Sequence, residues 1–348
     1  MRVMLAGTAS GCGKTTASLA LMAALRGRGM SVAPYKAGPD YIDPGYHRLA
    51  CGRTSHNLDE WLCAPGSVRR LLQLGDDADI SVIEGAMGFY DGLEGGDACS
   101  AYSLAKHTGT PVVLVVDAAG SAASAAAAAL GFLKYRPDHT IAAALVNRVS
   151  GERHFERVRD ALMKIGLPCV GWLPKDAALA MPDRHLGLVP AGERPRAGEQ
   201  IARAAALLRL DAEALRTVAK KVAEATEAPF EYPRSLAGRR IGVARDEAFS
   251  FVYEANLIAL TAMGAELAAF SPLADAALPE ALDALYLPGG FPEVFEERLR
   301  SNAAMAASVK AAVDGGLRVY AECGGMLYLA MIGAMPIPGG AIVSAPLV

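Results

Sequence analysis

The sequence lacks paired cysteines and long apolar runs. Its six cysteines form no CxxC pair and fit no zinc-ligand spacing, so they offer neither a disulfide framework nor a structural zinc site. The longest apolar run, at 121–133, is too short to span a bilayer. The short apolar run at 3–6 leads into a glycine-rich turn instead of a signal-peptide cleavage site. We therefore expect a soluble cytoplasmic protein with reduced thiols and no membrane partner.

An excess of basic charge is also missing. Lysine and arginine number 34 against 37 aspartates and glutamates, which gives a net charge of -3, and no Lys/Arg cluster is present. This balance argues against a nucleic-acid-binding surface. What the chain has in abundance is hydrophobic residues, 52% of 348, which is enough for two packed domains of ordinary size.

Apolar runs alternate with helical patterns along most of the chain. The run PVVLVVD at 111–117 is nearly all apolar, as expected for a central parallel strand covered on both faces. Similar short runs predict further strands at 2–6, 31–35, 80–83, 141–146, 169–173, 240–244, 266–270, 284–287 and 317–321. The pattern predicts an α/β protein with a doubly wound parallel sheet in residues 1–226, a linker at 227–238 and a second α/β domain at 239–348.

A glycine-rich loop, GTASGCGKTT at 7–16, stands between the first predicted strand and the first predicted helix. The backbone N–H groups of such a loop bind phosphate, so ATP is the expected ligand. Lys14 would reach the β- and γ-phosphates, and the Thr15 hydroxyl would bind Mg²⁺. The strict Walker pattern has glycine where this chain has Thr8, but the strand–loop–helix context supports the site. The expected nucleotide-binding residues are Gly11, Gly13, Lys14, Thr15, Thr16 and Asn147.

Several polar residues follow predicted strands, where parallel sheets place their ligands. Asp40 and Asp43, in a loop rich in proline and glycine, could hold Mg²⁺, orient substrate or form an ordinary Asx turn. Glu84 could be a metal ligand or could orient water. Asp91 could lie against the γ-phosphate or a substrate carboxylate. Asn147 could bind the adenine edge or simply end its strand.

Seven motifs carry a family resemblance: GTASGCGKTT, KAGPDYIDPGYH, EGAMGFYDG, LVNRV, MPDRHLGL, LYLPGGFPE and YAECGGMLYL. Together they resemble the cobyrinic acid a,c-diamide synthase family, which includes the hydrogenobyrinic acid enzymes, over the whole chain. The N-terminal part also resembles the dethiobiotin-synthetase type of P-loop fold. The C-terminal part resembles part of a class I glutamine amidotransferase.

The resemblance implies a ligase that amidates the a- and c-carboxylates of cobyrinic acid, a corrinoid, in cobalamin biosynthesis. ATP would phosphorylate each carboxylate, and ammonia, free or from glutamine, would displace the phosphate. Cys323, at a strand-to-helix turn flanked by glycines, matches the glutaminase nucleophile. The other residues implied are Asp43 and Asp91 for catalysis, Thr15, Asp40 and Glu84 for Mg²⁺, Tyr41, Tyr46 and His47 for substrate, and Gly290 and Gly324 for the oxyanion.

The sequence departs from the family at the expected base for this thiol. None of the six histidines follows Cys323, and the His-x-Glu segment of the family would fall after Val348. We therefore expect a partial amidotransferase domain with little or no glutaminase activity, next to a synthetase domain that can use free ammonia.

Two other functions remain open at this point. A nickel-sirohydrochlorin a,c-diamide synthase would differ only in its macrocycle. A non-catalytic P-loop nucleotide switch is disfavoured by Ala9, which stands where chromosome-partitioning ATPases carry a signature lysine, and by the domain that contains Cys323. The metal state of the macrocycle, the order of the two amidations and the formation of a homodimer are also open.

Overall fold

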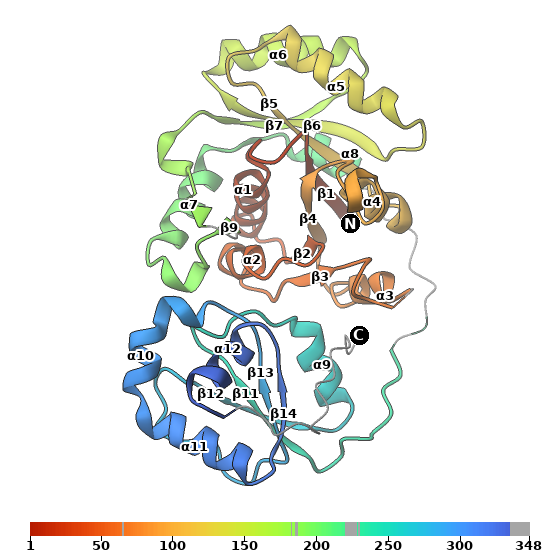
Figure 1. Ribbon diagram of the computed structural model, residues 1–348. Helices are drawn as coiled ribbons and strands as arrows, with labels where there is room; N and C mark the ends of the chain where they lie inside the picture. Colours follow the sequence, from red (N-terminus) through yellow and green to blue (C-terminus); the bar gives the residue numbers. More distant parts are fainter. Residues whose placement is uncertain (65, 182, 185–186, 220–227, 229, 335–348) are drawn as a thin grey trace. The chain divides into compact units, whose positions relative to one another are not determined.

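The computed structural model describes residues 1–64, 66–181, 183–184, 187–219, 228 and 230–334. The chain divides into two compact units, Met1–Pro229 and Phe230–Val348 (Figure 1). Residues 220–227, where the linker was expected to begin, lie outside the described residues, as does part of the MPDRHLGL motif. The domain limits at 226 and 239 therefore stay predictions.

The first unit is built on an eight-stranded sheet with the order β10-β7-β6-β5-β1-β4-β2-β3. All neighbours run parallel except β10, which is antiparallel to β7. The doubly wound parallel sheet expected from the alternating pattern is confirmed. Its strands are β1 (Arg2–Gly7), β2 (Val32–Ala37), β3 (His56–Leu58), β4 (Ile80–Gly88), β5 (Val112–Asp117), β6 (Ile141–Val149), β7 (Cys169–Pro174) and β10 (Arg209–Leu210).

Helices cover this sheet, which explains why its central strands are apolar on both faces. In the described residues, α1 packs with α2 and α7, and α5 packs with α6 (Figure 1). No helix there is long and apolar enough to cross a bilayer. The helices are α1 (Lys14–Gly27), α2 (Asp43–Cys51), α3 (Ser67–Gln73), α4 (Ala101–Thr108), α5 (Ala123–Tyr135), α6 (Glu152–Lys164), α7 (Ala197–Leu207) and α8 (Ala212–Val218).

Short elements complete the first unit. Three 3₁₀ turns, η1 (Leu93–Gly95), η2 (Ala177–Leu179) and η3 (Ala191–Glu193), lie in the connections between strands and helices. The strands β8 (Asp183–Arg184) and β9 (Gly187–Leu188) pair antiparallel with each other. The turn η2 follows β7 directly, at the carboxyl edge of the sheet where ligands of parallel α/β folds bind.

Helix α2 is a difference from the sequence expectation, which treated 36–47 as a loop. The Asp40 carboxylate accepts the backbone N–H groups of Ile42 and Asp43, at 2.8 and 3.0 Å, and so forms the Asx turn that starts the helix. Pro44 is compatible with this helix because it lies in the first turn, where its missing N–H has no partner inside the helix. Asp43 is thus fixed by regular structure.

The second unit has a parallel sheet with the order β12-β11-β13-β14. Phe249, Leu285, Leu287, Val309 and Tyr328 belong to its buried core. The four strands expected from the sequence are confirmed. The elements are β11 (Arg240–Ala244), α9 (Glu254–Ala262), β12 (Glu266–Phe270), β13 (Ala284–Leu287), η4 (Pro292–Phe295), α10 (Glu296–Ser301), α11 (Ala303–Asp314), β14 (Arg318–Ala321) and α12 (Gly324–Met331).

The centre of the first sheet gives a test of the fold. Leu5 in β1 is 0% exposed, so we expect Leu5→Ala to lower the free energy of unfolding by about 2–5 kcal/mol through lost burial and a cavity. Leu130→Ala removes the same atoms from α5, where Leu130 is 37% exposed, and should change it by about 0.5 kcal/mol or less. Urea unfolding followed by circular dichroism measures both. Equal losses would contradict the central position of β1.

Candidate active site

A cleft of about 560 Å³ opens beside the glycine-rich loop of the first unit. The segment 174–181, which follows β7 and contains η2, lines it together with residues from the loop, α1, α2 and β6. The cleft brings together most of the residues expected to bind ATP and Mg²⁺. These are Gly11, Gly13, Lys14, Thr15, Thr16, Asp40, Asp43 and Asn147.

The loop conformation requires glycine at Gly13. Its φ angle is 88°, and a Cβ added there would lie 2.0 Å from Nδ2 of Asn147. The same Asn147 nitrogen donates to the Cys12 carbonyl at 2.9 Å, so this side chain braces the loop from the end of β6. The adenine contact expected of Asn147 stays a prediction. Lys14 begins α1 directly after the loop and is almost buried.

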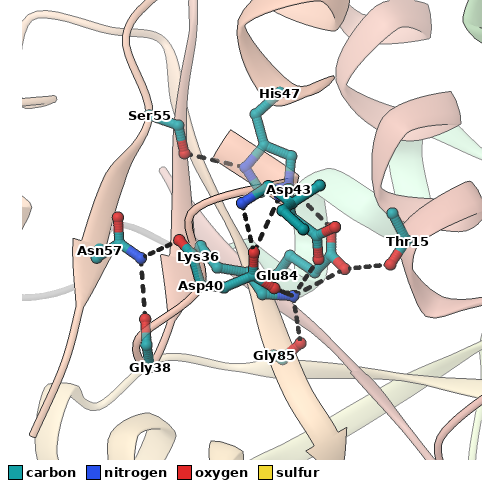
Figure 2. Close-up of polar contacts among 11 residues, drawn as sticks. Thr15, Lys36, Gly38, Asp40, Asp43, His47, Ser55, Asn57, Glu84 and Gly85 are labelled. Atoms are coloured by element: carbon teal, nitrogen blue, oxygen red, sulfur yellow. Dashed lines mark hydrogen bonds and ion pairs between the residues drawn. The ribbon is translucent and has the colours of Figure 1, made fainter. Parts of the chain in front are cut away.

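A buried polar cluster lies beside this loop (Figure 2). Lys36, in β2, donates through Nζ to Asp43 Oδ2 at 2.5 Å and to Glu84 Oε1 at 3.1 Å. The Asp40 carboxylate is 3.5 Å from the same nitrogen. Glu84 belongs to β4, the neighbour of β2, and is 0% exposed. Three carboxylates from three segments therefore surround a single ammonium group.

Glu84 also contacts the phosphate loop and α2. The Thr15 hydroxyl donates to Glu84 Oε1 at 2.6 Å, and His47 Nε2 lies 2.8 Å from Glu84 Oε2. Because an ionised carboxylate only accepts hydrogen bonds, Nε2 carries the hydrogen. His47 Nδ1 lies 2.9 Å from the Ser55 hydroxyl, and the ring is 0% exposed. These contacts direct the buried His47 ring at Glu84, and its expected contact with substrate stays a prediction.

The cluster shifts the pKa values of its members in opposite directions. Burial acts to raise the pKa of Glu84, but Lys36 and the hydrogen bond from His47 outweigh it, and the pKa lies well below its ordinary value. Burial acts to lower the pKa of Lys36, yet Asp43, Glu84 and Asp40 together raise it. Burial and the charges of Glu84 and Asp40 raise the pKa of Asp43 well above its usual range, against Lys36. With all three carboxylates ionised, the cluster would have more negative charge than Lys36 can balance, and the raised pKa of Asp43 reflects this.

This excess of negative charge fits a divalent cation. In the part of the chain that the structure describes, no group of three or more His, Cys, Asp or Glu side chains is arranged to hold a metal alone. Mg²⁺ does not need such a cage, since it keeps waters and binds through one or two carboxylates plus substrate phosphates. The Thr15 hydroxyl and the Glu84 carboxylate, in contact beside the phosphate loop, match that requirement.

Tyr41, Tyr46 and Asp91 are not among the residues that line the cleft. Tyr46 is 0% exposed, and its hydroxyl donates to the Val189 carbonyl at 2.5 Å, so its expected contact with substrate stays a prediction. Tyr41 is half-buried next to Asp40. Asp91 is exposed after β4, where its carboxylate accepts the Gly88 N–H at 3.1 Å, and it does not line the cleft.

No sequence pattern points to two supporting residues, Asn57 and Ser55. Asn57 in β3 donates to the carbonyls of Gly38 and Asp40, at 2.9 and 2.7 Å, and so fixes the loop that carries Asp40 (Figure 2). Ser55 orients His47. Both are ordinary polar residues near a short strand, and only the fold places them against the cluster.

The second unit contains a strained elbow at Cys323. This residue lies between β14 and α12 with φ 46° and ψ -113°, a conformation that costs energy for a residue with a side chain, and it is exposed. Close packing allows the turn: a Cβ on Gly324 would lie 3.0 Å from the Gly290 nitrogen, and one on Gly289 would lie 3.3 Å from the Cys323 Cβ. The structure thus brings the predicted nucleophile and oxyanion residues together, and their roles stay predictions.

Comparison with known protein families defines the class first. Residues 3–189 match the CobQ/CobB/MinD/ParA nucleotide binding domain, and residues 240–332 match the CobB/CobQ-like glutamine amidotransferase domain. The chain is therefore a P-loop protein with an amidotransferase-type domain. A solved structure of the signal recognition particle receptor FtsY from Elizabethkingia anophelis with GDP aligns at a TM-score of 0.35 and 17% identity, over 50% of this chain and 57% of that one, which is too low to support an argument.

Individual curated relatives define the family within this class. The cobyrinate a,c-diamide synthase of Listeria monocytogenes serovar 1/2a is 43% identical over 340 residues, covering 94% of this chain and 74% of that protein. The hydrogenobyrinate a,c-diamide synthase of Rhizobium meliloti is 42% identical over 330 residues, covering 94% and 76%. The chain belongs to the family of cobyrinate and hydrogenobyrinate a,c-diamide synthases. It spans about three quarters of the length of these relatives.

The elbow predicts selective thiol chemistry. Burial raises the pKa of Cys51 and Cys63 to about 11 and that of Cys169 to about 12, while Cys323 is exposed. Because the thiolate is the reactive form, we expect iodoacetamide at neutral pH to alkylate Cys323 before these three. Peptide mass spectrometry over a time course measures the order. Prior labelling of Cys169 in the folded protein would show that the elbow is not formed as described.

Proposed function

We propose that the chain catalyses the ATP-dependent amidation of the a- and c-carboxylates of cobyrinic acid, with glutamine or ammonia as nitrogen donor. The observation that carries this proposal is the cluster of Lys36, Asp43 and Glu84 in contact with Thr15 of the phosphate loop. Phosphoryl transfer to a carboxylate needs a phosphate cradle, cations and acidic groups. The phosphate loop and this cluster together supply them at one end of the cleft.

Each amidation then takes two steps. A substrate carboxylate oxygen attacks the γ-phosphorus of ATP, the bond to the β,γ-bridging oxygen breaks, and ADP leaves with that electron pair. Ammonia next attacks the carbonyl carbon of the acyl phosphate, loses a proton and expels inorganic phosphate. Lys14, at the start of α1, would spread the negative charge that builds up in the first step.

Mg²⁺ fits at the contact between Thr15 and Glu84, with Asp40 and Asp43 beside it. When bound there it would neutralise charge on the phosphate oxygens of ATP. Lys36 and His47 hold the two oxygens of Glu84 in fixed directions, so the carboxylate needs little rearrangement when ligands arrive. Asp43 lines the cleft from the first turn of α2, where it can orient the substrate carboxylate.

The second unit supports glutamine as one nitrogen source. The exposed Cys323 thiol precedes α12, and Gly324 packs closely against the backbone of Gly290, so the amides of these glycines would be the donors to the reacting carbonyl of a bound glutamine. Its attack on the glutamine side-chain amide would leave a thioester for hydrolysis, with the thiol proton passing to the departing ammonia. No histidine of this sequence follows Cys323 to carry that proton, so we expect this step to be slow and free ammonia to be the better donor. Ammonium salts bypass this step, so the two nitrogen donors test the two units separately.

The first functional prediction concerns Glu84. With cobyrinic acid, Mg-ATP and ammonium, we expect ADP release and products in which one or two carboxyl groups have become primary amides. Glu84→Gln removes the charge at the centre of the cluster and should lower kcat by about 10²–10³-fold. Glu156→Gln makes the same change on the exposed surface of α6 and should leave kcat unchanged. Coupled ADP assays and product mass spectrometry measure both.

Three outcomes would count against the proposal. Wild-type protein that releases no ADP with cobyrinic acid and ammonium would exclude this substrate. ADP release without a mass change would indicate a nucleotide hydrolase or switch. Full activity of Glu84→Gln would show that the cluster is not the reaction centre.

The second functional prediction concerns the metal. Thr15→Val keeps the shape of the side chain but removes the hydroxyl that contacts Glu84, so we expect the Mg²⁺ concentration for half-maximal ADP release to rise about tenfold or more. Thr15→Ser keeps a hydroxyl and should stay near the wild-type value. Titration of Mg²⁺ at fixed ATP gives the comparison. Equal Mg²⁺ requirements for the two variants would remove Thr15 from the metal site.

A further inference from the structure

The wall of the cleft formed by segment 174–181 is held by side chains of α7. The Gln200 Nε2 group donates to the carbonyls of Ala178 and Ala180, at 2.9 and 2.8 Å. One turn further along α7, Arg203 donates to the Asp176 carboxylate at 2.6 Å through its Nη2. Residues three apart share one face of a helix, so α7 presents both side chains to this wall.

Gln200 is oriented in turn by Arg194. The Arg194 Nη2 group donates to Gln200 Oε1 at 2.7 Å. Because an arginine only donates and a backbone carbonyl only accepts, these contacts fix which end of the Gln200 amide faces which partner. The Gln200 amide group therefore cannot flip without losing its hydrogen bonds to the wall of the cleft.

A second guanidinium nitrogen of Arg194 contacts helix α2. Its Nη1 group donates to the Tyr46 hydroxyl at 3.2 Å, and its guanidinium lies 5.8 Å from the centre of the Tyr46 ring. The single hydroxyl hydrogen of Tyr46 goes to the Val189 carbonyl, so its oxygen is free to accept from Arg194. Tyr46 is 0% exposed and cannot swing away without opening the packing around α2.

Helix α2 also carries two members of the polar cluster. Asp43 contacts Lys36, and His47 contacts Glu84. Asp43, Tyr46 and His47 stand at positions i, i+3 and i+4, so one side of the helix serves the cluster and Arg194 together. A chain of hydrogen bonds thus runs from this helix through Tyr46, Arg194 and Gln200 to the wall of the cleft opposite the phosphate loop.

We propose that Tyr46, Arg194 and Gln200 are positioning residues, a relay that holds the 174–181 wall at the distance from the phosphate loop that a nucleotide requires. This inference rests on the proposed function, because these three residues can affect turnover only if the same cleft binds the ATP that the reaction consumes. A relay acts as a unit: breaking it at any member releases the same wall, so the effects of two breaks do not add.

The experiment measures the Kd of Mg-AMP-PNP by calorimetry. Arg194→Ala and Gln200→Ala should each weaken binding on the order of tenfold, and the double variant should be no weaker than either single one. Tyr46→Phe, which removes only the hydroxyl, should weaken it in the same direction. In turnover, the KM for ATP should rise while kcat at saturating ATP changes by about twofold or less.

Two controls separate the relay from general loss of structure. Arg203→Ala breaks a contact with the same wall outside the relay, so its effect should add to that of Arg194→Ala. Arg159→Ala removes an arginine from the exposed surface of α6 and should leave the Kd unchanged. Additive losses for Arg194→Ala and Gln200→Ala, or a lower melting temperature with an unchanged Kd, would overturn the relay.

Failure of this inference is distinguishable from failure of the proposed function. The AMP-PNP measurement needs no corrinoid and no nitrogen donor. Normal nucleotide affinity in the relay variants, with wild-type turnover of cobyrinic acid intact, would reject only the relay. Weakened nucleotide affinity in protein that does not turn over cobyrinic acid would reject only the substrate.

Discussion

The first unit depends on one buried carboxylate, that of Glu84. A charged group without solvent contact is stable only when it is paired and hydrogen-bonded, and Glu84 has Lys36, Thr15 and His47 for this purpose. Each partner comes from a different segment: β2, the start of α1, and α2. Removing one partner would leave part of the charge uncompensated. The carboxylate therefore fixes the phosphate loop, the adjacent strand and the helix relative to one another.

The same interaction makes the site reactive as well as ordered. Glu84, Asp43 and Asp40 share the single charge of Lys36, so ionisation of all three would leave an unbalanced negative charge close to the phosphate loop. In a buried place this charge favours a cation more strongly than it would at the surface. A protein that binds Mg-ATP gains from such an arrangement, because the metal completes the charge balance when the nucleotide enters. The contacts that order Glu84 therefore also set the charge around the phosphate loop.

Much of the fold could be predicted because its signals are local. The run 111–117 predicts a strand buried on both faces, and it is the central β5. The loop 7–16 predicts a phosphate site from its glycines, from Lys14 and from its place between a strand and a helix. Helix α2 could not be predicted in this way, since Asp43, Pro44 and Gly45 look like turn residues when the hydrogen bonds that the Asp40 carboxylate accepts are unknown. Likewise, the contacts of Ser55 and Asn57 depend on which strands become neighbours, which no local pattern shows.

A sequence motif does not show which of its side chains are exposed to a substrate, and Tyr46 and His47 are examples. Tyr46 and His47 belong to a block that identifies the family, yet both are buried and both make hydrogen bonds inside the protein. Such buried residues hold other side chains of the site in position through hydrogen bonds inside the protein. His47 directs one oxygen of Glu84, and Tyr46 faces Arg194 from the same helix. Since α2 begins with Asp43 in the cleft, any shift of the buried residues moves that carboxylate too. The packing of the buried side of α2 therefore sets where the Asp43 carboxylate lies in the cleft.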